Sequence, residues 1–174
     1  VPKALDTKSA DAIAFVQEAT RRIGALPGVV RIAAGSFVPW RDADRLLPTF
    51  PFSADGHGLA VRDESPRARL RNVTPGFFAT LGIPIVAGRD FSERDADGAP
   101  MVAIVNETFA RYFFGAENPI GRRIGFSVDN DAGRMEIVGV VKDTVYTQVR
   151  PGEAGGEASG TLRIANTGVP RVVF

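Results

Sequence analysis

Apolar residues recur at helical spacing near the start of the chain. Ser9 precedes this repeat and is a typical helix N-cap, while Gly24 and the Pro27-Gly28 turn follow it. We therefore predict a helix over about residues 10–23 and a strand over residues 29–34. The buried face of this helix is expected to carry Ile13, Phe15, Val16, Ala19 and Ile23.

The second half of the chain alternates between strand-like and helix-like segments. Residues 101–105 are continuously apolar, as is typical of a strand that is buried on both faces. Asn106 then predicts the cap of a helix that Gly115 ends. Further strands are predicted over residues 119–126, 135–141 and 161–165. The inner face of the helix is expected to carry Phe109, Tyr112 and Phe113.

Prolines and glycines interrupt the region between these two parts. Residues 46–52 predict a short edge strand, and residues 67–73 and 83–87 predict two more. Between them, Thr74 is expected to cap a short helix that has Pro75 in its first turn.

The order of elements indicates an α+β fold with two lobes. Residues 1–40 and 100–174 are expected to form a layered α/β lobe in which a helix packs on a small sheet. Residues 41–99 are expected to form an inserted, β-rich lobe.

Composition excludes several classes of function. The chain has 21 basic and 20 acidic residues, so its net charge of +1 provides no general attraction to nucleic acid. It has no cysteine, and its one histidine, His57, lies between two glycines and is interpreted as a turn residue. Typical zinc sites and thiolate chemistry are therefore excluded. No run approaches the ~18 apolar residues of a membrane span.

Acidic residues gather in one polar segment. Asp90, Glu93 and Asp95 could pair for acid–base chemistry, but a solvated loop is the favoured interpretation. The acidic loops at 95–98 and 129–131 lack the glutamate that an EF-hand needs at its twelfth position. We therefore expect no catalytic, cofactor-binding or metal site.

Two groups of residues are candidates for contacts with a partner. Arg67, Arg69 and Arg71 alternate along one predicted strand and would share a face, which indicates either a docking surface or, as favoured here, a solvated face. Phe37 and Trp40 could contact a neighbouring subunit, although packing between the two lobes is favoured.

Five segments, taken in order, resemble a known family. They are residues 71–84 (RNVTPGFFATLGIP), 87–91 (AGRDF), 102–111 (VAIVNETFAR), 118–124 (NPIGRRI) and 136–143 (EIVGVVKD). Together they are similar to the periplasmic core domain of MacB-like and FtsX-like ABC transporter permeases. Unlike that family, the chain has a Gly-rich segment at 152–160 in place of a Pro/Tyr-rich strand.

The resemblance implies a location and a role. In the family the domain lies on the periplasmic side of the inner membrane, between two membrane helices, and has a porter-like α/β lobe with a β-rich insertion. The resemblance implies a non-catalytic domain that transmits ATP-driven motion and contacts an export substrate or partner. Implied partners are the permease's own membrane helices, a cytoplasmic ATPase that uses the ATP, a second permease copy and a periplasmic protein, with no nucleic acid.

Glycines in these segments predict tight turns or close approaches of backbone, and any hinge is expected near residues 35–45 or 126–134. The glycines are Gly76, Gly82, Gly88, Gly121 and Gly139.

An alternative function is a ligand-binding module. It would capture a lipid or peptide in an apolar cleft between the lobes. The residues expected to line that cleft are Phe37, Trp40, Phe50 and Phe52.

Overall fold

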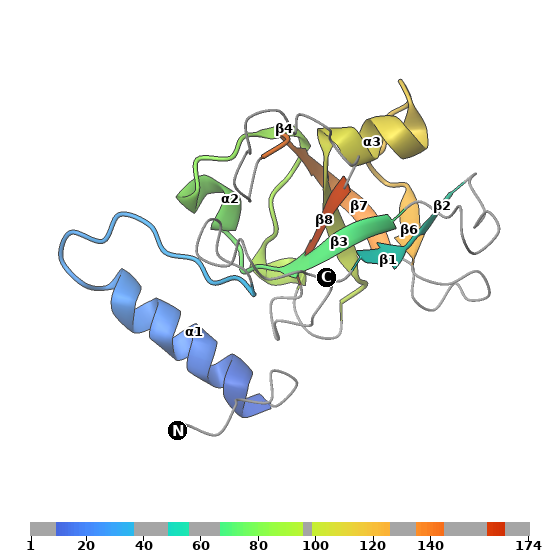
Figure 1. The fold of residues 1–174 in the computed structure, drawn as a ribbon. Coiled ribbons are helices and arrows are strands. Elements are labelled where there is room, and N and C mark those ends of the chain that lie inside the picture. Colours follow the sequence, from blue (N-terminus) through green and yellow to red (C-terminus); the bar gives the residue numbers. More distant parts are fainter. Residues whose placement is uncertain are drawn as a thin grey trace.

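In the part of the chain that it describes, the computed structural model has one mixed β-sheet and three α-helices (Figure 1). It describes residues 10–36, 49–55, 67–95, 99–125, 135–144 and 160–165. The helices are α1 (Ala10–Gly24), α2 (Phe77–Thr80) and α3 (Glu107–Phe114), and a 3-10 turn, η1, spans Glu93–Asp95. The strands are β1 (Thr49–Pro51), β2 (Ser53–Ala54), β3 (Arg67–Asn72), β4 (Ile85–Gly88), β5 (Val102–Asn106), β6 (Arg123–Gly125), β7 (Met135–Val141) and β8 (Gly160–Ala165).

The strands of the described residues join in a single sheet. Its order is β1-β3-β8-β5-β7-β6-β2, and β4 also pairs with β7. The β3–β8 and β5–β7 pairs are parallel, while the other pairs are antiparallel. The α+β class is therefore confirmed. Strands from the predicted insertion at 41–99 lie in the same sheet as later strands, so the division into two lobes stays a prediction.

Strand β5 lies at the centre of the core. All of its residues are buried, as its continuous apolar run predicts. Successive side chains of a strand point to opposite faces of the sheet. Ala103 and Val105 therefore pack in the cluster that includes the α3 phenylalanines, whereas Val102 and Ile104 pack in the cluster that includes α2.

Helix α3 begins and ends where the sequence predicts. The Asn106 side chain accepts a hydrogen bond from the Phe109 N–H at 3.2 Å, and Gly115 follows the last turn. Phe109 and Phe113 are buried, but Tyr112 is 60% exposed, so its predicted burial is wrong. Phe114 is buried beside Phe113 instead, which shifts the apolar stripe away from Tyr112.

Thr74 does not cap α2 as predicted. Its hydroxyl accepts the Ala34 N–H at 2.8 Å and donates to the Ala34 carbonyl at 3.3 Å. The cap position of α2 is Gly76, which makes no side-chain cap bond. Thr74 thus bonds to the segment after α1 and does not cap α2. Phe77 and Phe78 are buried, as expected for the apolar side of this helix.

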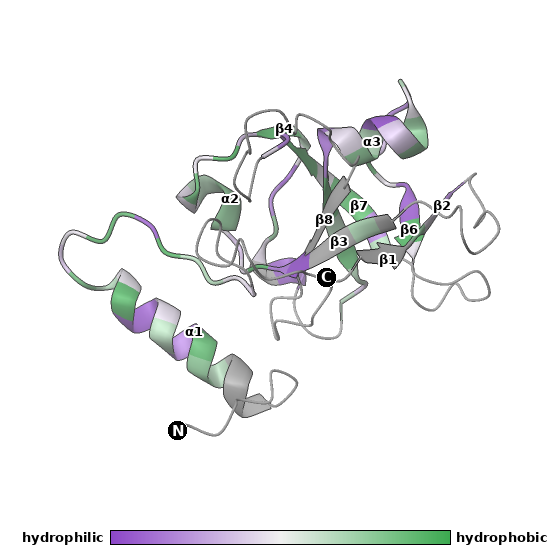
Figure 2. Cartoon of the chain, in the orientation of Figure 1, coloured by the Kyte–Doolittle hydropathy of each residue, from purple (hydrophilic) through white to green (hydrophobic). Residues whose placement is uncertain are grey.

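Helix α1 forms where the repeat predicts, but it lies apart from the sheet (Figure 1). Phe15 is 60% exposed and Ile23 is 45% exposed, so their predicted burial is wrong. Gly24 remains in the helix, and the left-handed residue of the following turn is Gly28, with φ of 85°. Figure 2 shows hydrophobic residues along α1 in spite of its separation from the core.

Residues 29–34 do not form the predicted strand. They have no regular secondary structure, and the segment meets the sheet only at its end, where Gly35 forms an isolated antiparallel bridge with Val73. No described strand lies beside them. A locally strand-like sequence forms a strand only where a neighbouring strand can pair with it.

Candidate functional site

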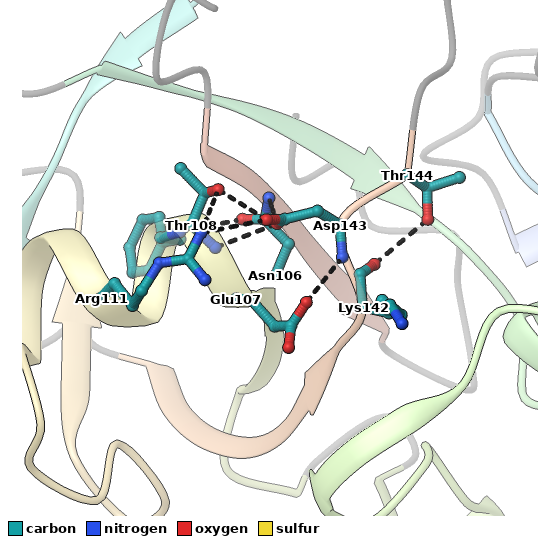
Figure 3. Close-up of polar contacts among 8 residues, drawn as sticks. Asn106, Glu107, Thr108, Arg111, Lys142, Asp143 and Thr144 are labelled. Atoms are coloured by element: carbon teal, nitrogen blue, oxygen red, sulfur yellow. Dashed lines mark hydrogen bonds and ion pairs between the residues drawn. The ribbon is translucent and has the colours of Figure 1, made fainter.

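The main candidate site lies at the junction of β7 and α3. Because β5 and β7 are parallel neighbours, α3, which follows β5, begins beside the residues that follow β7. Four side chains meet there, and we call them the Asp143 clasp (Figure 3). The members are Asn106, Thr108, Arg111 and Asp143.

The Asp143 carboxylate is the centre of this clasp. It accepts hydrogen bonds from Asn106 Nδ2 at 2.6 Å, from the Thr108 N–H at 3.0 Å and from the Thr108 hydroxyl at 2.7 Å. Arg111 Nη2 lies 3.3 Å from its second oxygen. In return, the Glu107 carboxylate accepts the Asp143 N–H at 3.4 Å. The end of β7 and the start of α3 are thus joined by bonds in both directions.

The electrostatics of the clasp favour a negative charge. The first N–H groups of a helix lack partners within the helix and carry a partial positive charge. Asn106 Oδ1 accepts the Phe109 N–H, and the Asp143 carboxylate accepts the N–H of Thr108, the second residue of the helix. The carboxylate is therefore used as a structural cross-link between two segments that are 35 residues apart in sequence.

A second close contact joins β4 and β7 through glycines. Gly88 pairs with Gly139, and a Cβ on Gly139 would lie 2.4 Å from the Arg89 carbonyl oxygen. A Cβ on Gly88 would lie 2.2 Å from the Val138 carbonyl oxygen. Only glycine allows this approach. Gly88 also has a positive φ angle, of 70°. So do the other predicted glycines, with φ of 79° at Gly76, 67° at Gly82 and 82° at Gly121.

An ion pair follows the Gly88 contact. Arg89 donates to both oxygens of Asp95, at 2.8 and 2.7 Å, and the Ser92 N–H donates to the same carboxylate at 2.8 Å. The Asp95 side chain is 5% exposed, whereas that of Arg89 is 49% exposed. The Arg89 guanidinium holds the pKa of Asp95 below its usual value, and Asp95 in turn raises the pKa of Arg89.

The three candidate carboxylates therefore have different surroundings. Asp95 belongs to the ion pair, while burial raises the pKa of Asp90, whose carboxylate accepts the Phe91 N–H at 2.8 Å. Glu93 lies in η1, and its side chain is outside the described part of the chain. Within that described part, no three acidic or histidine side chains gather as a metal site would require.

The structure describes the side chain of only one of the three arginines in the predicted face. Arg71 is 4% exposed, so the favoured interpretation of a solvated face is wrong at this position. A docking surface at Arg67 and Arg69 stays a prediction. Arg67 and Arg69 lie in β3, opposite Pro51 and Thr49 of β1, and their side chains are outside the described part. Arg71 lies opposite Arg163 of β8, and a sequence pattern alone does not reveal its burial.

Several other candidates lie outside the described residues. They are Phe37, Trp40 and His57, together with the predicted hinge at 126–134 and most of that at 35–45.

One residue that was expected to line the apolar cleft of the alternative function lies in the core instead. Phe52 is 1% exposed and packs edge-on against Phe109, with ring centroids 6.1 Å apart. It is a core residue, and it does not line a surface cleft. Phe50 lies in β1, and its side chain is outside the described part of the structure.

Sequence reasoning missed Asp143 as a site residue. The signal was present, because an acidic residue lies two positions after an apolar strand and a capped helix follows another. Only the parallel pairing of β5 and β7 brings the two together.

Comparison with known proteins defines the class of this domain. The chain has the fold of the extracytoplasmic regions of ABC-type transporters. It matches the MacB-like periplasmic core domain over residues 5–163 and belongs to that family. No curated protein sequence matches the chain. Among the described residues, no helix has the length and apolar character to cross a bilayer.

Two solved structures show the likeness in fold. The periplasmic region of MacB from Actinobacillus actinomycetemcomitans is 18% identical, with a TM-score of 0.51. The extracellular domain of the noncanonic ABC-type transporter YknZ from Gram-positive bacteria is 14% identical, with a TM-score of 0.52. Each match covers 87% of this chain, but only 55% and 62% of those chains, respectively. The chain therefore spans less than two thirds of the relatives that it matches.

Proposed function

We propose that this chain is a non-catalytic extracytoplasmic domain of an ABC transporter permease. It transmits ATP-driven motion from the membrane helices of its permease and contacts an export substrate or a partner protein. Its family membership supports the location on the far side of the membrane from the ATPase.

The Asp143 clasp is the observation that carries the proposal. A domain that passes on motion must move as a unit, because internal rearrangement would absorb the displacement. The clasp ties the end of β7 to α3, and the Arg89–Asp95 pair ties the residues after β4 to η1. In both cross-links the carboxylate joins two segments through hydrogen bonds and an arginine.

The proposal extends to the parent protein. The full-length permease lies in the inner membrane, with membrane segments on both sides of residues 1–174, and this domain faces the periplasm. The domain itself binds no cofactor, since a separate cytoplasmic ATPase uses the ATP. A second permease copy and a periplasmic protein are the proposed partners, with Phe37, Trp40, Arg67 and Arg69 as proposed contacts.

Energy transfer from a fluorophore to the membrane tests the proposed motion. The intact permease and its ATPase are reconstituted in liposomes that contain an acceptor lipid, and the fluorophore is attached through Val86→Cys. Val86 is 48% exposed, and this chain has no other cysteine. We expect transfer to change when ATP is added, and to stay constant with an ATPase that cannot hydrolyse ATP.

Two variants distinguish a role in transmitting motion from a role in catalysis. Asp143→Ala should reduce the ATP-dependent change in energy transfer without stopping ATP hydrolysis, because the clasp no longer joins β7 to α3. Asp90→Asn should leave the change intact, since Asp90 has no part in the clasp. A constant signal with active ATPase in the unmodified protein would refute the proposal. Loss of export in Asp90→Asn with unchanged motion would indicate an enzyme instead.

A further inference from the structure

The two ends of the strand order lie next to each other in the chain. β1 and β2 are these ends, yet only Phe52 separates them. In a flat sheet, the outer two of the seven strands in this order would lie about 29 Å apart, because neighbouring strands are about 4.8 Å apart. The Cα atoms of Pro51 and Ser53 lie within about 7.6 Å of each other, since one residue separates them. The sheet is therefore rolled until its two edges meet (Figure 1).

Residues 49–55, which we call the strap, join these two edges. The first half of the strap, β1, pairs with β3, and the second half, β2, pairs with β6. Just beyond β2, the Asp55 N–H donates to the Arg123 carbonyl at 2.9 Å, and the Arg123 N–H donates to the Asp55 carboxylate at 2.8 Å. The strap is thus bonded to both edges, and it closes the rolled sheet into a barrel.

The middle of the strap is anchored in the core of this barrel. Phe52 lies between the two halves, is 1% exposed and packs against Phe109 of α3. The same buried cluster contains side chains of β5, β6 and β7 together with the other phenylalanines of α3. The strap therefore covers the α3 phenylalanines on the side where the two edges of the sheet meet.

The ladders that hold the strap are short. It pairs with β3 over residues 49–51 and with β6 over residues 53–54, whereas β5 pairs with β7 along its whole length. Pro51 has no N–H to donate to its ladder. Elements with few backbone bonds open more readily than the centre of a sheet. Because one buried ring lies between the two halves, withdrawal of Phe52 from the core would free both halves together.

We propose that the strap is a conformational device that closes the barrel and releases as one unit from β3 and β6 while β5 and β7 stay paired. Its release opens the barrel along one side and uncovers the phenylalanines of α3. This proposal rests on the strand order and on Phe52, and it does not depend on the proposed function.

Amide hydrogen exchange tests whether the strap opens as one unit. Exchange is followed residue by residue by NMR in the 174-residue chain, and each rate is divided by the intrinsic rate of that amide. The Asp55 N–H reports the β6 side. Alternate residues of an antiparallel strand donate to the partner strand, so residue 49 or 50 supplies the probe on the β3 side. Ile104, in the buried strand β5, is the control.

We expect the two strap probes to have equal protection and to exchange about tenfold or more faster than Ile104. Unequal protection of the two strap probes would show that β1 and β2 open as independent edges. Protection equal to that of Ile104 would show that the barrel opens only when the whole domain unfolds. Either of these results overturns the proposal.

A disulfide across one edge gives a second test. Asp55→Cys and Arg123→Cys are made together, and the chain has no other cysteine. Opposed residues that are hydrogen-bonded in an antiparallel ladder have Cα atoms about 5.5 Å apart, which suits a disulfide. The reduced form of the same double variant is the matched control.

Oxidation should slow exchange on the β3 side of the strap about tenfold or more, although that side is not cross-linked, because release of one half requires release of the other. Slower exchange on the β6 side alone would show that the halves move independently. A folded double variant that forms no disulfide would show that the strap is not seated on β6. Both results contradict the proposal.

Discussion

Removal of the Asp143 carboxylate should weaken the link between β7 and α3. In Asp143→Ala, the Thr108 N–H loses its acceptor at 3.0 Å, and Asn106 Nδ2 loses its acceptor at 2.6 Å. Loss of a helix cap costs about 1 kcal/mol, and loss of a negative charge at a helix N-terminus costs roughly 0.3–1 kcal/mol more. Asp143 is 38% exposed, so water can replace part of the lost bonding.

We therefore expect Asp143→Ala to lower the free energy of unfolding by about 1–2 kcal/mol. For a chain of this size each kcal/mol shifts Tm by roughly 2–4 °C, so the Tm should fall by roughly 2–8 °C. Calorimetry and urea unfolding monitored by circular dichroism measure both quantities. Asp143→Asn should lose less, because the amide oxygen can still accept the Thr108 N–H while the charge is gone.

Glu117→Ala is the matched control for this prediction. Glu117 also pairs with an arginine, Arg122, at 2.7 Å, but it is 69% exposed and caps no helix. An exposed pair contributes about 0–1 kcal/mol. If Asp143→Ala and Glu117→Ala destabilise the protein equally, the clasp is an ordinary surface ion pair and the reasoning is wrong.

Four further predictions concern the core and the turn after β4. Gly139→Ala should lower the free energy of unfolding by about 3 kcal/mol or more, because its Cβ would lie 2.4 Å from backbone; an unchanged urea midpoint would contradict this. Phe109→Ala should cost about 3–5 kcal/mol, whereas Tyr112→Ala, at a 60% exposed position, should cost far less; urea midpoints compare the two. Asp95, with a lowered pKa, stabilises the fold above the unfolded pKa and loses this contribution as pH falls through the folded value, so Asp95→Asn should flatten the loss of Tm in acid. Asp90, with a raised pKa, has the opposite sign, so Asp90→Asn should keep or raise Tm at pH 7; a clear fall would show that its charge is stabilising.

The elements that sequence reasoning predicted best are those in which local pattern and burial agree. Strands β5 and β7 consist almost wholly of apolar residues, and the strand predicted over residues 135–141 coincides with Met135–Val141. Helix α3 begins at its predicted cap because Asn106 bonds within its own first turn. Such features depend on neighbours in the chain, so the sequence carries them directly.

The errors fall where a distant segment decides the outcome. Thr74 is a good local cap, yet its hydroxyl bonds to Ala34, which is 40 residues away. Arg71 has a polar side chain on an alternating strand, yet its position in the sheet buries it. Helix α1 has a regular apolar stripe, but periodicity shows only that one face is apolar and not what covers it.

The amino-acid sequence by itself determined the helices, the buried strands, the capping residue of α3 and, through its ordered segments, the family. Only the tertiary structure decided that the strands form one mixed sheet, that Gly88 and Gly139 meet, and that Asp143 closes on α3. The physical reason is the distance along the chain over which each effect acts. Propensity and periodicity act over a few residues, whereas the contacts of Asp143 and Gly139 exist only after parallel and antiparallel pairing has brought distant strands together.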